Sequence, residues 1–274
     1  MGPIRVVVRR GDVVEATHLV HVAASDGLLY GDDVVSHLRS AAKPIQAIPV
    51  AEAYGDLGDD ELAIACASHQ AEPAQLAAVR TLLARAGATP DDLENGPQED
   101  RPHGKLGHNC SGKHAGFLAA CRANGWPFAG YRLPEHPLQQ RIRALLEDGE
   151  PAVDGCGVPT YAQPLTAQAR LLLGTPARVA EAMRARPELV GGDGADDTAL
   201  MRLRPGFLAK RGAEGLLCAV SPDGRGYAFK VADGNGRALR PAIAAVLGID
   251  ELATVPLLNS RGETVGAIEL DATP

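Results

Sequence analysis

The 274-residue chain has few lysines, few aromatic residues and no long apolar run. A membrane-spanning helix needs roughly 18–20 consecutive apolar residues, so we expect no membrane segment. Acidic residues outnumber basic ones, 34 to 27, for a net charge of −7. Because nucleic-acid binders concentrate lysine and arginine, a nucleic-acid partner is not expected. With 45% hydrophobic residues, the chain is not a disordered protein and can bury a sizeable core.

Lysine is rare even among the basic residues. Only five of the 27 are lysines and the rest are arginines; the five are Lys43, Lys105, Lys113, Lys210 and Lys230. A buried ammonium can lose its proton and act as a base, which a guanidinium cannot do. Each lysine is therefore a candidate for chemistry, although a few could remain by accident.

Residues 1–8 run straight into a strand-like stretch and show no apolar core of a signal peptide. The five cysteines are therefore expected to be reduced thiols. Together these features predict a cytoplasmic protein.

Strand-like stretches are predicted at both ends of the chain, with helices between them. The first strands are expected as a hairpin over residues 4–22, followed by a short strand near 28–30. Later strands are expected at 215–220, 227–231, 253–257 and 264–268. Helical periodicity covers residues 44–54, 59–67, 73–86, 112–124, 137–147, 165–173, 176–186 and 237–247. Residues 89–107 are expected as a polar connection.

This order predicts an α/β (α+β) fold, in which both chain ends build one antiparallel sheet with helices packed on it. We expect a single domain over residues 1–274. Its sheet lobe would cover about 1–40 and 205–274, and its helical lobe about 41–204.

Ser40 and Lys43 form a Ser-x-x-Lys element at the start of a predicted helix. Residues three apart on a helix share one face, so the two side chains are expected within hydrogen-bonding reach. A neutral Lys43 amine would take the Ser40 proton, and free backbone N–H groups at the helix start would hold an oxyanion. The alternative is a capping serine beside a surface lysine.

Ser68 follows an apolar stretch, in the run Ser68-His69-Gln70-Ala71-Glu72. A serine–lysine amidohydrolase needs a second hydroxyl to relay a proton toward the leaving amine. The alternative is that Ser68 caps the helix predicted from residue 73, with Glu72 in its favourable first turn.

Two cysteines lie in polar stretches that contain glycine, His108-Asn109-Cys110-Ser111-Gly112-Lys113-His114 and Asp154-Gly155-Cys156-Gly157. The two thiols, with the Lys113 amine and the Asp154 carboxylate, form a possible four-ligand zinc site. Two alternatives stay open. One is a cysteine nucleophile activated by His114, and the other is a pair of buried small hydrophobes.

Lys210 is predicted at a strand edge, where it would place an ammonium beside the second serine. Lys230 lies on another predicted strand, and a solvated side chain or an ion pair with Asp233 explains it without chemistry. Which of the two lysines partners Ser68 stays open at this point.

Taken together, these stretches resemble the asparaginase II family of the Rhizobium etli type. The matching segments lie in order along nearly the whole chain, at residues 39–47, 68–72, 108–114, 154–159 and 210–215. That family has a serine β-lactamase/glutaminase-like fold, in agreement with the predicted order of strands and helices. Its pattern has glycine at the position of Ala71.

The resemblance implies hydrolysis of L-asparagine to L-aspartate and ammonia. Ser40 with Lys43 would form one catalytic pair, and Ser68 with Lys210 the other. Zinc would be bound by Cys110, Lys113 and Cys156, with Asp154 nearby. The substrate-binding residues would be Arg39, His69, Glu72, Asn109 and His114. A homodimer is expected.

Two other functions fit the same residues. One is a glutaminase or another small-amide hydrolase on the same fold. The other is a non-catalytic zinc-binding protein, in which the cysteines hold loops together.

Overall fold

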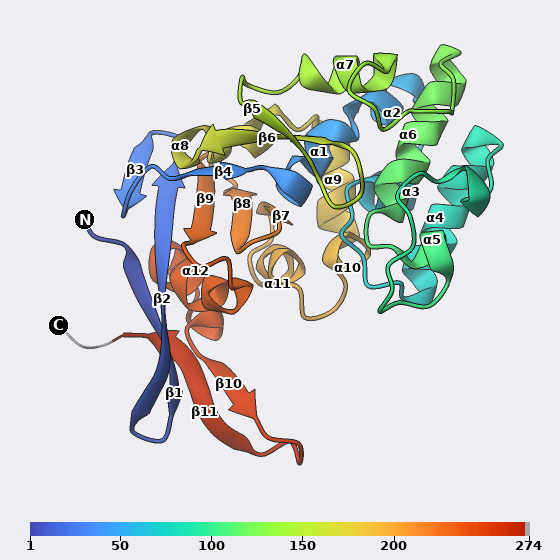
Figure 1. Cartoon of the computed structure of the whole chain (residues 1–274). Helices are drawn as coiled ribbons and strands as arrows, with labels where there is room; N and C mark the ends of the chain where they lie inside the picture. Colours follow the sequence, from blue (N-terminus) through green and yellow to red (C-terminus); the bar gives the residue numbers. More distant parts are fainter. Residues whose placement is uncertain (272–274) are drawn as a thin grey trace.

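Both ends of the chain build one antiparallel sheet, seen in the computed structural model, which describes residues 1–271 (Figure 1). Its strand order is β10-β11-β1-β2-β9-β8-β7, and β3 pairs with β2. The strands are β1 (Ile4–Arg10), β2 (Val13–Ala24), β3 (Gly27–Tyr30), β7 (Leu208–Arg211), β8 (Leu216–Val220), β9 (Gly226–Val231), β10 (Val255–Leu258) and β11 (Thr264–Leu270). The predicted sheet and its hairpins are confirmed.

A second, three-stranded sheet has the order β4-β6-β5, with β4 (Val35–His37), β5 (Glu150–Val153) and β6 (Pro159–Pro164). This sheet was not predicted from the sequence. It joins two segments that are distant along the chain, because the backbone N–H of Leu38 donates to the Tyr161 carbonyl at 3.0 Å. The chain leaving β4 and the turn between β5 and β6 are thereby brought together.

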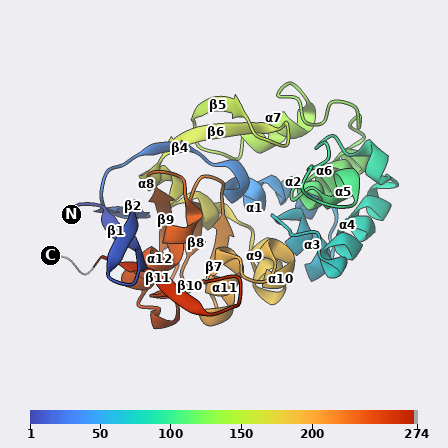
Figure 2. The same ribbon diagram turned by 60° about the horizontal axis from the view of Figure 1, so that its bottom comes forward.

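The helices fill the middle of the chain and lie mostly beyond one side of the large sheet (Figures 1 and 2). They are α1 (Lys43–Gln46), α2 (Ile48–Ala53), α3 (Asp59–Ala65), α4 (Pro73–Ala86), α5 (Gly104–Gly107), α6 (Ser111–Asn124), α7 (Pro137–Arg143), α8 (Leu165–Gln168), α9 (Ala177–Ala185), α10 (Pro187–Gly191), α11 (Asp196–Leu203) and α12 (Leu239–Leu247). Short 3-10 turns are η1 (Arg39–Ala42), η2 (Pro90–Asp92), η3 (Leu171–Gly174), η4 (Gly236–Ala238) and η5 (Asp250–Leu252).

Two packing groups form the core. In the helical part, α3, α4 and α6 pack on one another, while α12 packs against β1, β9 and β11 of the sheet. Buried side chains such as Leu62, Leu82 and Leu118 fill the first group, and Val20 and Ile243 lie in the second. Between them runs α11, which contacts β7. Within residues 1–271, no helix combines the length and apolarity needed to cross a membrane.

Several predicted elements are shorter or broken in the structure. The helix expected over 44–54 is two helices, α1 and α2, with the break at Ala47. Pro49 has no N–H to donate to the preceding turn, so one continuous helix cannot form. The helix expected over 137–147 ends at Arg143, and the connection over 89–107 contains η2 and α5.

Candidate active site

The side chains of two buried lysines meet on one serine hydroxyl. Lys43 Nζ lies 3.0 Å from Ser68 Oγ, and Lys210 Nζ lies 3.1 Å from the same oxygen. Lys43 begins α1, Ser68 follows α3, and Lys210 lies on β7. The two lysines are fully buried and Ser68 is 5% exposed. The site therefore connects the helical part of the molecule to the large sheet.

Each of the two lysines has a different set of partners. Lys43 donates to the Ala67 carbonyl at 2.5 Å and has no carboxylate partner within bonding distance among the described residues. Burial lowers its pKa. Lys210 forms an ion pair with Asp197, 3.1 Å from Oδ2. Burial lowers the pKa of Lys210 to about 8, although the Asp197 carboxylate acts in the opposite direction.

Asp197 is a buried carboxylate that the sequence analysis missed. It lies in the first turn of α11 and accepts hydrogen bonds from the Lys210 ammonium and from the backbone N–H of Arg211, both at 3.1 Å. Burial acts to raise its pKa, but Lys210 and Arg211 outweigh burial and the pKa lies below the ordinary value. Acidic residues are common in the first turn of any helix, so its sequence position gave no signal.

The second cluster consists of two thiols, an ammonium and a carboxylate. Cys110 and Lys113 lie at the start of α6, while Asp154 and Cys156 lie in the turn between β5 and β6. Lys113 Nζ is 3.0 Å from Cys156 Sγ, and that sulfur is 4.0 Å from Asp154 Oδ2. Hydrogen bonding from Cys156 holds the pKa of the Cys110 thiol well below its usual range. Lys113 and Asp154 thus both contact Cys156, and the four predicted zinc ligands lie in one part of the structure.

The donor set of this cluster suits a soft metal ion. Thiolate sulfur and an amine nitrogen bind zinc, and binding a metal displaces protons from both kinds of group. Within residues 1–271, however, no group of three or more histidine, cysteine, aspartate and glutamate side chains is placed to hold a metal ion. A metal here would therefore need Lys113 as a ligand beside Cys110 and Cys156.

A cavity of about 210 Å³ opens beside the second cluster. It is lined by Arg39, Ser40, Gln98, His108, Asn109, Cys110, Asp154, Gly155, Cys156 and Ala213. Arg39 Nε is 2.5 Å from Asp154 Oδ1, so a cation and an anion share one wall. Burial lowers the pKa of Lys43 and the nearby Cys110 thiol opposes this, so the two side chains are neighbours. The cavity is thus connected to the Ser68 network through Cys110 and Lys43.

The expected hydrogen bond between Ser40 and Lys43 is not found in the described residues. Ser40 lies in the cavity wall, whereas the Lys43 side chain runs inward to Ala67 and Ser68. A buried amine must replace its water partners, and the Ala67 carbonyl supplies one at the end of α3. The expected contact between Ser68 and Lys210 is present. The alternative role of Ser68 as a helix cap is wrong, because Glu72 is the N-cap of α4.

Lys230 does not approach Ser68. Its Nζ donates to the carbonyls of Glu214 and Val231, both at 2.7 Å. Neither the solvated side chain nor the ion pair with Asp233 expected from the sequence is found. Instead, Lys230 fixes the backbone of the loop that follows Lys210.

Of the predicted substrate-binding residues, Arg39 and Asn109 line the cavity and three others do not. His69 is fully buried: its Nε2 is 2.8 Å from Ser111 Oγ, and its Nδ1 accepts from the backbone of Ala71. Burial lowers the pKa of His69 to about 3, so its imidazole is neutral near pH 7.

Glu72 and His114 are also outside the cavity. Glu72 is the N-cap of α4, where its backbone N–H donates to Gln75 Oε1 at 3.1 Å. His114 is fully buried, and its Nδ1 is 2.7 Å from the hydroxyl of Tyr131. Burial holds the pKa of His114 well below its ordinary value, which disfavours the role of a base for a cysteine nucleophile.

Four further lining residues, Gln98, His108, Gly155 and Ala213, were not predicted as site residues. His108 belongs to the motif that contains Cys110, which was the available signal. Gln98 comes from the polar connection, where its Oε1 accepts from the backbone of Asn109 at 3.2 Å. Nothing in the sequence distinguishes Gln98 from its polar neighbours.

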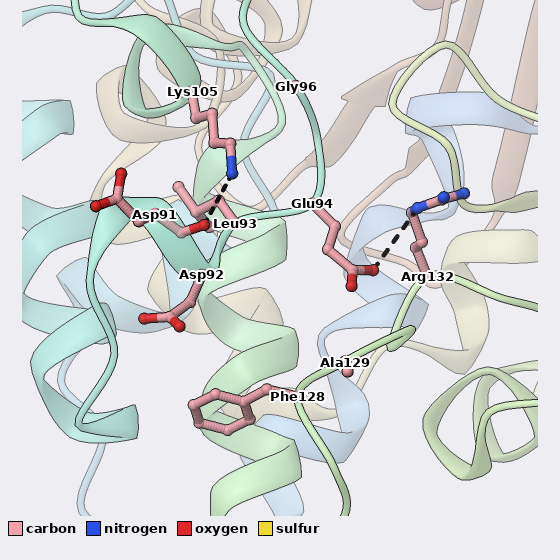
Figure 3. Close-up of a pocket in the computed structure, with 9 residues that line it drawn as sticks. All are labelled: Asp91, Asp92, Leu93, Glu94, Gly96, Lys105, Phe128, Ala129 and Arg132. Carbon is pink, nitrogen blue, oxygen red and sulfur yellow. Dashed lines mark hydrogen bonds and ion pairs between the residues drawn. The ribbon is translucent and has the colours of Figure 1, made fainter.

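A larger cavity of about 540 Å³ lies elsewhere, between η2, α5 and the loop after α6 (Figure 3). Its two cations already have partners. Lys105 donates to the Asp91 carbonyl at 2.8 Å, and Arg132 lies 3.7 Å from Glu94. Figure 3 shows no serine, cysteine or histidine among the residues lining it, so this cavity offers no hydroxyl, thiol or imidazole side chain of these types.

A serine hydroxyl bound by neighbouring amines is the group that acyl-transfer hydrolases activate, and the fold and site together indicate that class. The chain matches the family described as L-asparaginase II over residues 6–270 and belongs to that family. It is therefore an amide hydrolase. A search of the curated proteins finds no match to the chain.

Proposed function

We propose that this protein hydrolyses the side-chain amide of L-asparagine to L-aspartate and ammonia. The observation that carries this proposal is the hydroxyl of Ser68 held between two buried lysines. Ser40 lies in the wall of the cavity that Cys110 also lines. Membership of the L-asparaginase II family supports the substrate.

The cavity is smaller than the roughly 300–1,000 Å³ typical of sites for drug-sized ligands, which favours a small substrate. L-Asparagine carries an ammonium and a carboxylate at one end. Arg39 and Asp154 offer one group of each sign on the cavity wall. We assign these two residues to the charged end of the substrate, which leaves the side-chain amide near Ser40.

In the proposed reaction, Ser40 Oγ attacks the amide carbonyl carbon and its proton passes to the network that begins at Lys43. The pair of Ser68 and Lys210 then gives a proton to the amide nitrogen, the C–N bond breaks, and ammonia leaves. Water hydrolyses the resulting ester and restores the Ser40 hydroxyl. The absent hydrogen bond between Ser40 and Lys43 is compatible with this role, because catalytic hydrogen bonds often tighten only with substrate bound.

We also propose that Cys110, Lys113 and Cys156 bind zinc, with Asp154 beside them. Bound zinc would supply a positive charge that helps to orient the charged end of the substrate. The protein side chains do the rest: Arg39 positions Asp154, and the turn between β5 and β6 places Cys156 next to the start of α6.

The reaction is tested by ammonia release from L-asparagine, L-glutamine and short amides, measured in parallel. The Ser40→Ala variant should lose turnover by a factor of roughly 10⁴ or more while remaining folded. Ser68→Ala should lose roughly 10²–10⁴ because a proton relay is removed. Mass spectrometry after rapid quenching should find the acyl group on Ser40; an adduct on Ser68 would reverse the two roles. No ammonia from any substrate would reject the function.

The metal is tested by elemental analysis of the purified protein. Cys156→Ala should reduce bound zinc and raise KM more than it lowers kcat. Cys121→Ala is the matched control, because Cys121 is a buried cysteine of the same helix as Lys113 and touches none of the proposed ligands. Equal zinc content in the two variants would reject the site.

The cytoplasmic location and the homodimer stay predictions. All five cysteines are free and buried, which suits a reducing compartment. Sedimentation of the purified protein measures the oligomeric state, and a monomer at micromolar concentration would contradict the expected dimer.

A further inference from the structure

The ammonium of Lys210 has three hydrogen-bond acceptors around it. They are Ser68 Oγ at 3.1 Å, Asp197 Oδ2 at 3.1 Å and the Arg211 carbonyl oxygen at 3.0 Å. A lysine ammonium carries three N–H donors and no acceptor, so these contacts satisfy it completely. Asp197 is the one carboxylate among the three, and it is as fully buried as Lys210.

This arrangement decides the direction of the hydrogen bonds at Ser68. Because Lys210 uses an N–H on Ser68 Oγ, that oxygen accepts on this side. Lys43 Nζ donates to the same oxygen at 3.0 Å, so Ser68 Oγ accepts from both lysines and its own proton points away from Lys210. A neutral Lys210 would have a lone pair and could accept the hydroxyl proton itself, which would reverse the chain of hydrogen bonds.

We propose that Asp197 is a positioning residue that holds Lys210 as a three-donor ammonium and thereby fixes the direction of the Ser68 hydroxyl. This inference rests on the proposed amide hydrolysis, in which Lys210 and Ser68 deliver a proton to the leaving ammonia. Asp197 touches neither the cavity nor Ser68. Besides Lys210 it accepts from the backbone N–H of Arg211, and it reaches the Ser68 hydroxyl through Lys210.

The charged and titratable groups facing Lys210 come from every element around it. Asp197 of α11 favours the protonated form, whereas Lys43 of α1 and Arg211 of β7 oppose it. The thiols of Cys66, after α3, and Cys218, on β8, also face Lys210, and burial raises the pKa of each to about 12. Both thiols are therefore neutral below pH 10, and Asp197 is the anion that offsets the burial of this ammonium.

The Asp197→Asn variant tests the proposal, because asparagine keeps the size and an acceptor oxygen but removes the charge. In the native enzyme, activity should fall as the pH rises through about 8, where Lys210 loses its proton. In Asp197→Asn, this fall in activity on the alkaline side of the pH profile (the alkaline limb) should occur about 1–3 pH units lower. At the native optimum, kcat should fall roughly ten- to hundredfold with KM nearly unchanged.

Asp196→Asn is the matched control. Asp196 is the preceding residue in the same first turn, and its carboxylate pairs with Arg240 at 2.8 Å instead of Lys210. Its removal takes the same charge from the same helix end, yet the alkaline limb should stay in place. If activity falls at the same alkaline pH in Asp197→Asn and Asp196→Asn, the proposal is overturned.

A second set of variants covers the case in which Asp197→Asn alone does not fold, since it leaves a buried ammonium without its counter-ion. In a Lys210→Met background the Lys210 ammonium is absent, so Asp197→Asn leaves no buried ammonium without a counter-ion. If Asp197 acts through Lys210, adding Asp197→Asn there should lower kcat by less than a factor of two. A further loss as large as in the native background would show an independent role and overturn the inference.

A readout without substrate separates this inference from the reaction itself. The loss of stability caused by Asp197→Asn, measured by denaturant unfolding, should shrink as the pH rises from 6 to 9, because the unpaired Lys210 ammonium gives up its proton. The loss caused by Asp196→Asn should not change in this way. If the native protein releases no ammonia, the proposed function fails, and this pH dependence still supports or overturns the link between Asp197 and Lys210.

Discussion

Three of the five lysines of the chain lie in one site with at most 2% of their surface exposed: Lys43, Lys113 and Lys210. Burying an ammonium is costly unless the surroundings compensate it, so three such residues close together require a reason. The scarcity of lysine was therefore a usable signal for the site. It failed for Lys105 and Lys230, whose ammonium groups bind backbone carbonyls and hold loops.

Ala71 occupies a backbone conformation that favours glycine. Its φ is +64°, in the left-handed region, and it follows the motif residues Ser68 and His69. A side chain there costs roughly 1–2 kcal/mol, of which the greater freedom of glycine in the unfolded chain cancels a part. Ala71→Gly should therefore raise the free energy of unfolding by up to about 1 kcal/mol, measured by urea denaturation.

Ala77→Gly is the control for Ala71→Gly. Ala77 is exposed in the middle of α4, with ordinary helical geometry, and its replacement by glycine should lower stability by about 1 kcal/mol. Opposite signs for the two substitutions are the expected result. Equal losses would show that the strain at Ala71 is negligible.

Asp196 and Asp197 are two residues whose different roles could not be predicted from the sequence. Two adjacent aspartates open α11, and either would be an ordinary first-turn residue. In the structure, Asp197 faces β7 and Lys210, whereas Asp196 pairs with Arg240 of α12. Which of the two contacts the site depends on how α11 packs between its neighbours, and no local pattern encodes that rotation.

At the scale of elements, the close contact of α6 with the end of α3 supports the site. A Cβ at Gly112 would lie 2.1 Å from the Ile64 carbonyl oxygen, so only glycine fits there. The same carbonyl accepts from the backbone N–H of Ala67 and so forms the turn that leads to Ser68. Gly112 thus allows α6, with Lys113, to lie directly against that turn.

Gly112→Ala should lower stability by about 1–3 kcal/mol, because backbone must move to admit the methyl group. It should also lower kcat by displacing Ser68. Gly116→Ala, one turn further along α6, is the control: its Cβ would lie 3.3 Å from the Ala65 side chain, a tight but tolerable contact. Thermal unfolding and ammonia release measure both variants. A Gly112→Ala protein as stable and active as Gly116→Ala would contradict this account.

Some elements could be predicted to the residue and others not at all. The helix α4 runs from Pro73 to Ala86 as predicted, because proline opens its first turn and Gly87, at φ +61°, ends it. The strands of the second sheet were missed. They are three to six residues long, and β5 and β6 contain prolines, so they show neither alternation nor a β-branched run.

At the scale of the whole molecule, strands from the two ends of the chain pair with each other in the large sheet. β1 pairs with β11, and β2 pairs with β9. A buried polar network adds a second connection, since Lys210 of β7 reaches Ser68 after α3. The pairing of the chain ends holds the sheet together, and the buried polar network joins the sheet to the helices. Neither part contains all residues of the site.

This sharing predicts that residues 1–274 unfold as one cooperative unit. Trp126, the one tryptophan of the chain, follows α6 in the helical part and reports on that part by its fluorescence. A second reporter is a Trp126→Phe protein with Tyr227→Trp, which places tryptophan on β9 of the sheet. Urea transitions followed at the two positions should have the same midpoint and the same slope.

Circular dichroism of both proteins corrects for any stability change that the substitutions cause, because each fluorescence curve is compared with the dichroism curve of the same protein. Coincident curves in both cases mean that the contacts between Lys210, Ser68 and Asp197 form only when sheet and helices fold together. An earlier transition at Trp126 than at position 227 would instead define two separately folding units. The site would then be lost at the first transition while the sheet remained, and the single domain expected from the sequence would be wrong.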